Sequence, residues 1–385
     1  MDTIYLDYNA STPVDDAVQE AMLPFFSHAW GNPSSMHGFG LAAKKAIELA
    51  RKNTATLIGA EAREIVFTRG GTEANNLAIS GYITALGSSG KRIISSPIEH
   101  SSVYGCMRKL EQEGYEICEL PVDKYGIVKI DKLPELITTD TVLISVMLAN
   151  NETGSLQPIR EIAAIARQYH IPIHTDAIQA AGKIPVDVNE LGIDLLSLSG
   201  HKLHGPKGVG ALYVRHGIKV RSLMRGGWQE EGRVPGTENV PGIVGMGKAC
   251  EIAAQTMKEE NRRLTVLRNR LEMELLNRIP LAKINGHPEN RLPNMLNISF
   301  PGLINEQIVA QLDYHGIAVS GGSACNANSV EPSRVHLAAG LTREEALGAL
   351  RISLGLKTTA TEIARAIEII SQVISNHYTG NPNAK

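Results

Sequence analysis

Short apolar runs alternate with helical patterns from about residue 64 to residue 214. The segment 158–170 between two of these runs has residues at the spacing of one helix face, namely Ile159, Ile162, Ala163, Ala166 and Tyr169. Strands that alternate with helices form a mostly parallel sheet covered by helices, so the pattern predicts an α/β fold. The strands that it predicts are 64–68, 92–96, 141–148, 171–175, 194–199 and 210–214.

The character of the chain changes after about residue 255. A charged amphipathic helix, KEENRRLTVLRNRLEMELLNR, is followed by the strand-like run NMLNISF and by further helical segments. This mixture is typical of a smaller α+β domain. The run LDYNAST near the N-terminus has no neighbouring strand in sequence, and we assign it to the smaller domain. We therefore expect a large domain over 12–255 and a small domain made of 1–11 and 256–385.

Composition and charge exclude several classes of protein. With 385 residues, 43% of them apolar, the chain can bury a large core, which argues against disorder. The formal net charge of -2 gives no basic surface for direct binding of a nucleic acid. No run of about eighteen apolar residues occurs, and the N-terminus carries acids where a signal peptide is apolar. We therefore expect a cytoplasmic protein that does not interact with membranes.

Polar motifs follow five of the predicted strands directly. In chain order they are GGTEANN, EH, NNET, DAIQ and GHK. In an open parallel sheet, ligands bind beyond the carboxyl ends of the strands. Segments that are far apart in the sequence are therefore expected to meet in one cleft.

Lys202 and Asp176 carry the chemistry that we expect in this cleft. Lys202 lies in SGHKLHGPKG after a buried strand, where a desolvated amine can form a Schiff base with a carbonyl cofactor. Asp176 ends another strand, where a carboxylate can keep a pyridine nitrogen protonated, as pyridoxal phosphate requires. Taken alone, each residue has a structural alternative, because Lys202 could lie on a glycine-rich surface turn and Asp176 could cap a helix.

The segment GGTEANN is expected to begin a helix after the first strand. Its backbone N–H groups, the Thr72 hydroxyl and the helix dipole would favour an anion such as a phosphate. It is not a P-loop, because no Lys-Ser or Lys-Thr pair follows the glycines. His100, at the end of the next strand, could lie flat against a cofactor ring and move protons. The structural alternatives are an ordinary threonine helix cap and a structural histidine.

The four cysteines are far apart and form no CxxC pair, so the sequence predicts neither a zinc site nor a disulfide framework. Cys106, Cys118 and Cys250 lie in apolar or helical surroundings that favour small buried side chains. Cys325 differs, because SGGSACNANS surrounds it with Gly, Ser and Asn, a composition typical of an exposed loop. It is the candidate reactive thiol.

The ordered motifs of the chain resemble those of cysteine desulfurases of the NifS/IscS type. They are YLDYNASTP, GNPSSMHGFG, GGTEANN, EHSSV, NNETG, DAIQ, SGHKLHGPKG, PGTEN, SGGSAC and RISLG. Those enzymes are class V aminotransferase-like proteins of fold type I that bind pyridoxal 5'-phosphate, and the similarity spans nearly the whole chain. The resemblance implies the PLP-dependent transferase fold, with a mostly parallel sheet in a large domain and a smaller α+β domain.

The resemblance also implies a role for each matching residue. Lys202 would form the Schiff base with the cofactor, and Asp176 would pair with its pyridine nitrogen. Arg351 would bind the α-carboxylate of the substrate together with Asn151. Cys325 would be the nucleophile that accepts sulfur. The other residues expected around the cofactor are Gln179 at the ring oxygen, His100 on the ring face, Thr72, Ser199 and His201 at the phosphate, Gly71 and Asn151 beside the cofactor, and Thr237 from the other subunit of a homodimer.

The implied activity converts L-cysteine into L-alanine and leaves a persulfide on Cys325 that is passed to a protein acceptor. A flexible Gly/Ser/Asn loop suits a thiol that must travel from cofactor to acceptor. The alternatives are a selenocysteine lyase, another class V PLP enzyme and, outside the enzymes, an inactive scaffold. The sequence leaves open whether the sulfur serves iron–sulfur assembly, tRNA thiolation or sulfur modification of DNA.

Overall fold

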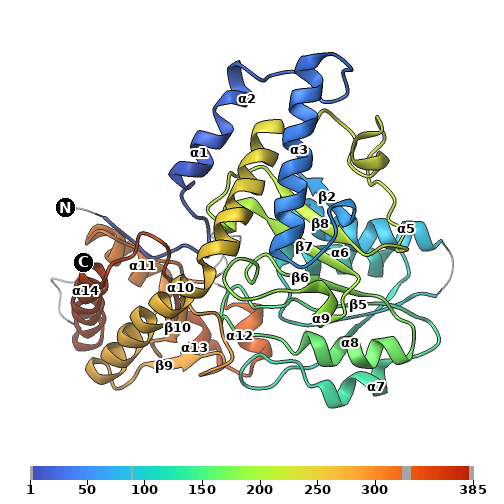
Figure 1. The fold of residues 1–385 in the computed structure, drawn as a ribbon. Helices are drawn as coiled ribbons and strands as arrows, with labels where there is room; N and C mark the ends of the chain where they lie inside the picture. The colour runs from blue at the N-terminus through green and yellow to red at the C-terminus, as the bar shows by residue number, and fades with distance from the viewer. Residues whose placement is uncertain (1–2, 88–89, 323–330, 381–385) are drawn as a thin grey trace.

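The computed structural model describes residues 3–87, 90–322 and 331–380, which pack into a larger and a smaller unit (Figure 1). The larger unit contains a seven-stranded sheet, and the smaller unit contains a three-stranded and a two-stranded sheet. One long helix, α10 (Val240–Arg278), belongs to both units. Both ends of the described chain lie on the side of the smaller unit (Figure 1).

The seven-stranded sheet is mostly parallel. Neighbouring strands from β7 to β4 are parallel, whereas β8 runs antiparallel to both of its neighbours. The predicted α/β fold is therefore confirmed, and so are the six predicted strands. In spatial order the strands are β2 (Ile65–Thr68), β8 (Gly210–Val214), β7 (Leu195–Ser199), β6 (Ile173–Asp176), β5 (Thr141–Ser145), β3 (Arg92–Ser95) and β4 (Glu116–Glu119).

The edge strand β4 was missed by the sequence pattern. It pairs only with β3, and its residues EICE expose both glutamates while Ile117 and Cys118 are only partly buried. Two apolar residues are too short a run to indicate a strand. The prediction that Cys118 is a buried side chain is wrong for the same reason, because an edge strand covers its residues incompletely.

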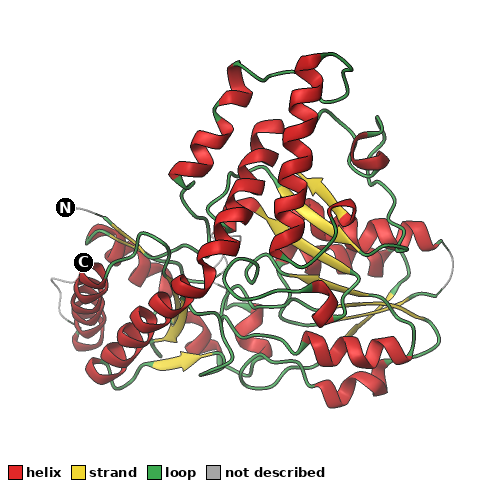
Figure 2. Ribbon diagram, in the orientation of Figure 1, coloured by secondary structure: helices red, strands yellow, loops and turns green. Residues whose placement is uncertain are grey.

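Helices cover both faces of the large sheet (Figures 1 and 2). Side chains of β2 show the alternation that this requires, because Phe67 packs in one core and Val66 in the other. The predicted helix face is buried in α8 at Ile159 and the three positions that follow it up to Ala166. At Tyr169 the prediction is wrong, because this residue is the C-cap of α8, where the helix ends, and it is 49% exposed. On one face lie α3 (Gly38–Leu57), α8 (Ile159–Gln168), α9 (Val188–Leu191) and the first half of α10; on the other lie α4 (Gly71–Asn76), α5 (Tyr82–Leu86) and α6 (Ser101–Gln112).

The smaller unit has its own hydrophobic core, to which the second half of α10 contributes Leu267 and Leu271. Residue 255 lies within α10, a single continuous helix, so the division of the chain into domains at this residue stays a prediction. The strands are β12 (Ala349–Ser353), β10 (Met295–Ser299) and β9 (Lys283–Asn285), and β1 (Ile4–Tyr5) paired with β11 (Ile317–Ala318). The other helices are α11 (Asn305–Tyr314), α12 (Arg334–Ala338), α13 (Arg343–Leu347) and α14 (Ala360–Thr379).

Helices α1 (Asp16–Met22) and α2 (Pro24–Ser27) project from the body of the molecule beside the start of α3 (Figure 1). Of the helices in the described ranges, none combines the length and the apolar character needed to cross a membrane.

Candidate active site

Five polar segments meet at the carboxyl ends of the parallel strands. They follow β2, β3, β5, β6 and β7, as the sheet topology requires. β12 of the smaller unit adds Arg351, and the chain before α1 adds Asn9 and Ala10. The cavity that they surround has a volume of about 230 Å³. Ten of the predicted site residues line it: Gly71, Thr72, His100, Asn151, Asp176, Gln179, Ser199, His201, Lys202 and Arg351.

Lys202 lies at the end of a short turn that directly follows β7. Its Nζ donates hydrogen bonds to the backbone oxygens of Asn9, at 2.6 Å, and Ala10, at 2.7 Å. The two carbonyls hold the amine in the pocket. An amine in this position is available for a carbonyl compound that enters the cavity.

Asp176 is buried at the end of β6 and is held by two hydrogen bonds. Its Oδ1 accepts from the backbone N–H of Ile178 at 2.9 Å, and its Oδ2 accepts from Nδ2 of Asn75 at 2.7 Å. Asn75 in turn donates to Oγ of Ser102 at 2.8 Å. These two contacts fix the carboxylate at the cavity, where it can face a protonated ring nitrogen.

His100 caps the N-terminus of α6. Its Nδ1 accepts from the backbone N–H of Ser102 at 3.2 Å, which leaves Nε2 to carry the ring proton. Burial lowers the pKa of His100; nearby Asp176 acts in the opposite direction and Lys202 in the same direction. The lowered pKa favours the neutral imidazole.

Thr72, Ser199 and His201 lie together at the end of the pocket where α4 begins. Nδ1 of His201 is 3.3 Å from Oγ of Ser11. Burial, and after it the charge of Lys202, lowers the pKa of His201 to about 4. These neutral hydroxyl and imidazole groups, with the first N–H groups of α4, can hold a phosphate by hydrogen bonds.

Arg351 on β12 is almost completely buried, and its guanidinium is only partly used within the protein. Nη1 donates to the backbone oxygen of Asn151 and Nη2 to Oδ1 of Asp7, each at 3.0 Å. The side chain of Arg351 is 3% exposed. The pocket therefore contains a fixed guanidinium with further N–H groups to offer to an anion.

Two buried polar atoms at this pocket have no hydrogen-bond partner within the part of the chain that the structure describes. They are Oδ1 of Asn151 and Nε of Arg351. Buried polar groups are normally paired, so these atoms indicate a polar ligand. An amine, a buried carboxylate and a group of phosphate donors stand around the same cavity. This set of donors fits pyridoxal phosphate with an amino acid bound beside it.

Thr237 and Cys325 are the two remaining residues of the predicted site. Thr237 is exposed in the segment before α10 and does not line this cavity. Cys325 lies outside the described residues. The groove on the phosphate side of the pocket is lined by Arg233 and Val234, close in sequence to Thr237.

The three cysteines in the described part of the chain are poor nucleophiles. Burial raises the pKa of Cys106, Cys118 and Cys250, and for Cys250 the value is about 12. A thiol with a raised pKa holds little thiolate near neutral pH. None of the three lines the pocket around Lys202.

Sequence reasoning missed three polar residues of the site. Asn75 supports Asp176, Asp7 binds Arg351, and the backbone of Asn9 binds Lys202. All three lie inside motifs that were recognised, GGTEANN and YLDYNASTP, but their partners are far away in the chain. The sequence therefore showed the motifs that contain these residues, but not the distant residues that they contact.

Comparisons with known proteins agree with this geometry. A model of the aminotransferase class-V family matches residues 4–366. The chain is 50% identical over 371 residues to the cysteine desulfurase IscS of Methanosarcina thermophila, covering 96% of this chain and 92% of the relative. A solved NifS-like protein superposes with a TM-score of 0.92 at 38% identity, covering 97% of this chain and 99% of that one. A structure of SspA in complex with cysteine has a TM-score of 0.80 at 38% identity, with coverages of 91% and 99%.

The family model covers nearly the whole chain, and the relatives match it from end to end. The lysine, carboxylate and phosphate donors of the pocket fit the cofactor that such enzymes use. The chain therefore belongs to the class V aminotransferase family, and within it to the cysteine desulfurases that depend on pyridoxal phosphate.

Proposed function

We propose that this desulfurase binds free L-cysteine and pyridoxal phosphate in the pocket around Lys202 and transfers the cysteine sulfur to Cys325. The observation that carries the proposal is that Lys202, Asp176 and Arg351 line one cavity. They supply an amine for a carbonyl cofactor, a carboxylate for a pyridine nitrogen and a guanidinium for a substrate carboxylate. The relative whose structure holds cysteine supports cysteine as the substrate.

Asp176 and Lys202 would hold the cofactor. When bound, pyridoxal phosphate supplies an electron sink for bonds at the α-carbon of an amino acid. Asp176 would pair with the pyridine nitrogen and keep it protonated, because Asn75 and the backbone of Ile178 hold the carboxylate in place at the cavity. Lys202 would hold the cofactor through its amine, the group that forms a Schiff base with a carbonyl.

His100 would cover the face of the cofactor ring. Its imidazole is neutral because burial lowers its pKa, and Nδ1 is occupied by the backbone N–H of Ser102. Nε2 therefore carries the ring proton and is the atom that could give it up. His100 would therefore hold a proton close to the substrate and return it when the product forms.

Arg351 and Asn151 would orient the substrate through its α-carboxylate. Asp7 and the carbonyl of Asn151 hold the guanidinium of Arg351 in one orientation. Its other N–H groups would therefore point at the substrate carboxylate from a fixed position. The side-chain oxygen of Asn151, which has no partner among the described residues, can accept a hydrogen bond from the ligand. A rigid two-point contact of this kind brings the reacting atoms together without further ordering of the protein.

Cys325 would take the sulfur. Its thiolate would attack the sulfur of the substrate, so that a sulfur–sulfur bond forms, the carbon–sulfur bond breaks and the carbon takes up a proton, giving alanine. The proposal rests on the loop sequence around Cys325 and on the raised pKa of the other three thiols. We place the reaction in the cytoplasm, where free thiols stay reduced, with a protein as the next sulfur acceptor.

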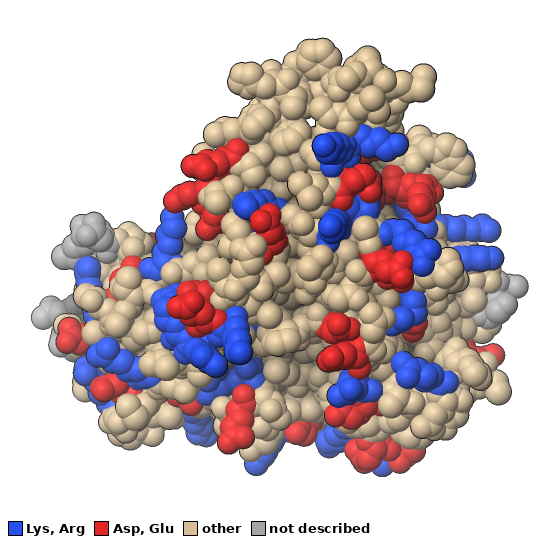
Figure 3. All heavy atoms as spheres, viewed as in Figure 1, with Lys and Arg blue, Asp and Glu red and all other residues tan. Residues whose placement is uncertain are grey.

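A second copy of the chain would complete the site. The tips of α1, α2 and α3 carry no charged side chains over a wide area of the face shown in Figure 3. Exposed apolar side chains gather there, among them Phe26, Trp30 and Phe39. A groove beside Thr72 opens near Arg233, in the segment that leads to Thr237. A homodimer would cover the apolar tips and bring Thr237 of one protomer to the phosphate of the other.

The experiment that tests the proposal compares the wild type with Lys202→Ala. The wild type should release alanine and sulfide from cysteine in the presence of a thiol reductant, whereas the variant should release neither and should lack visible cofactor absorption. Lys219→Ala, at an exposed lysine outside the pocket, is the matched control. Turnover by the wild type of selenocysteine alone would favour a selenocysteine lyase, and no turnover of either amino acid would favour a scaffold.

A further inference from the structure

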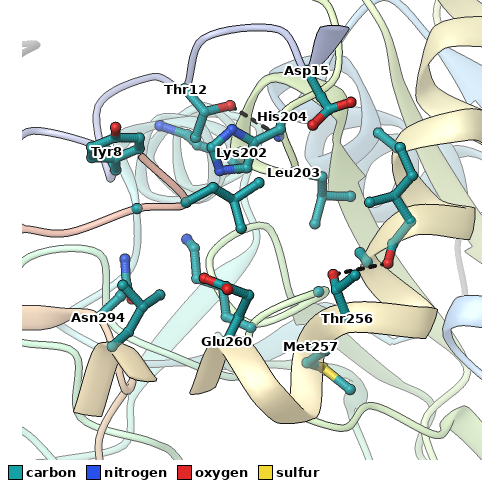
Figure 4. Close-up of a pocket in the computed structure, with 18 of the residues that line it drawn as sticks. Tyr8, Thr12, Asp15, Lys202, Leu203, His204, Thr256, Met257, Glu260 and Asn294 are labelled. Atoms are coloured by element: carbon teal, nitrogen blue, oxygen red, sulfur yellow. Dashed lines mark hydrogen bonds between the residues drawn. The ribbon is translucent and has the colours of Figure 1, made fainter. Parts of the chain in front are cut away.

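Lys183 is a partly buried lysine that contacts Gln179, one of the residues that line the cofactor pocket. Its Nζ donates to Oε1 of Gln179 at 2.8 Å and to the backbone oxygen of Gln179 at 3.2 Å. The side chain lines a second cavity, which shares Lys202 with the cofactor pocket. Figure 4 shows Lys202, His204 and Glu260 around this cavity, which has a volume of about 60 Å³ and room for a few water molecules.

The contact with Lys183 determines the orientation of the Gln179 side-chain amide, that is, on which side its oxygen lies and on which side its nitrogen lies. In its charged form the amine of Lys183 can only donate, so the atom of Gln179 that it then contacts is the oxygen. On the other side, Nε2 of Gln179 donates to the backbone oxygen of Asn9 at 3.0 Å. That carbonyl can only accept, so it requires the amide nitrogen there. Both partners therefore demand the same orientation of one buried side chain.

Gln179 also lines the cofactor pocket, close to the residues that would hold the ring. Its amide nitrogen carries two hydrogen atoms, of which one is used by Asn9. The second remains for an acceptor in the pocket. An amide turned the other way would present its oxygen instead, and an oxygen repels the anionic ring oxygen of pyridoxal phosphate.

We propose that Lys183 is a positioning residue of the desulfurase site, because it holds Oε1 of Gln179 and so directs the amide N–H of Gln179 at the ring oxygen of the cofactor. The inference rests on the role proposed above for Gln179. Lys183 acts only through Gln179 and through its charge, and it does not touch the cofactor or the substrate.

The charges around Lys183 make its protonation sensitive to the ligand. Burial, followed by the charges of Lys202 and Arg351, lowers the pKa of Lys183 to about 7. An anionic ring oxygen on the far side of Gln179 would favour the charged amine. The titratable groups that share the second cavity with Lys183 are Tyr8, Asp15, Lys202, His204 and Glu260.

The test uses the holoenzyme and measures the pH midpoint of the visible absorption of the bound cofactor. Loss of an N–H donor and of a nearby positive charge both favour the protonated chromophore. Lys183→Met should therefore move the midpoint upward by about one pH unit. Lys183→Arg keeps the charge and the donors and should move it much less. Lys248→Met, at a lysine on α10 that pairs with Glu251, is the matched control.

Gln179→Leu and the double variant separate this inference from the proposed role of Gln179. If Lys183 acts through Gln179, the double variant should shift no further than the larger single shift. A shift in Gln179→Leu with none in Lys183→Met would overturn the role of Lys183 alone. No shift in either variant would overturn the role of Gln179 as well.

A measurement on the protein without cofactor keeps the inference testable if a variant binds the cofactor poorly. In protein labelled with ¹⁵N-glutamine, the side-chain amide signals of Gln179 should titrate with a midpoint near neutral pH, following Lys183. In Lys183→Met the same signals should be independent of pH in this range. Signals that titrate equally in the wild type and in Lys183→Met would overturn the contact between the two side chains.

Discussion

Replacement of Arg351 by lysine should weaken cysteine binding far more than it affects the cofactor. The guanidinium donates to the carbonyl of Asn151 and to the carboxylate of Asp7 at the same time, each at 3.0 Å. Its buried Nε has no hydrogen-bond partner among the described residues. A lysine amine is a single point and cannot reach both protein partners and a substrate carboxylate together. At least one charge-assisted hydrogen bond is therefore lost.

The size of the effect follows from that loss. A hydrogen bond to a charged group contributes about 1.5–3 kcal/mol. Since about 1.4 kcal/mol corresponds to a factor of ten, Arg351→Lys should raise KM for cysteine roughly 10- to 150-fold. The positive charge remains near Asp7, so the fold and the cofactor content should change little.

The assay is steady-state alanine release over a range of cysteine concentrations, with cofactor content measured from the visible absorption. Arg291→Lys is the matched control, because Arg291 is also 3% exposed and paired, with Glu272, but lies outside the pocket. A KM within about threefold of the wild type, with full cofactor content, would move the carboxylate site away from Arg351.

Three further results follow from the same geometry. Asp176→Asn should lower turnover by about 100-fold or more, because a neutral amide cannot hold a proton on the pyridine nitrogen; turnover near the wild-type rate would remove Asp176 from this role. Asn75→Ala removes one of the two donors to Asp176, so turnover should fall by about tenfold, and an unchanged rate would show that Asn75 does not support the carboxylate. If Thr237 completes the pocket of the partner, mixing and refolding Lys202→Ala with Thr237→Ala chains should restore activity to about a quarter of the wild type. The reason is that about half of the dimers are mixed and each mixed dimer keeps one of its two sites intact. No recovery of activity, or a fully active monomer by analytical ultracentrifugation, would contradict the shared site.

Much of the fold could be predicted from the sequence, because buried strands leave a strong local signal. The six strands from Ile65 to Val214 are apolar runs followed directly by polar motifs. The edge strand β4 was missed because half of its residues face solvent. The pocket was predicted at the carboxyl ends of the strands for a topological reason, since parallel strands bring their following loops to one edge.

The partners of the site residues could not be predicted in the same way. Lys202 meets the carbonyl of Asn9 across 193 residues, and Arg351 meets Asp7 across 344. These contacts depend on how the N-terminal segment lies between the two sheets, for which the local pattern holds no signal. The role of Lys183 likewise becomes visible only when its distance to Gln179 is known.

The central claim is that the sulfur of cysteine is transferred to Cys325, and mass spectrometry of the trapped persulfide tests it most directly. Wild type and Cys325→Ser would be given cysteine labelled with heavy sulfur, without reductant, and then alkylated and digested. The labelled sulfur should appear on the peptide that contains Cys325 in the wild type, and Cys325→Ser should bind the cofactor normally but release no alanine beyond background. Label on Cys106, Cys118 or Cys250, or alanine release by Cys325→Ser at the wild-type rate, would contradict the account.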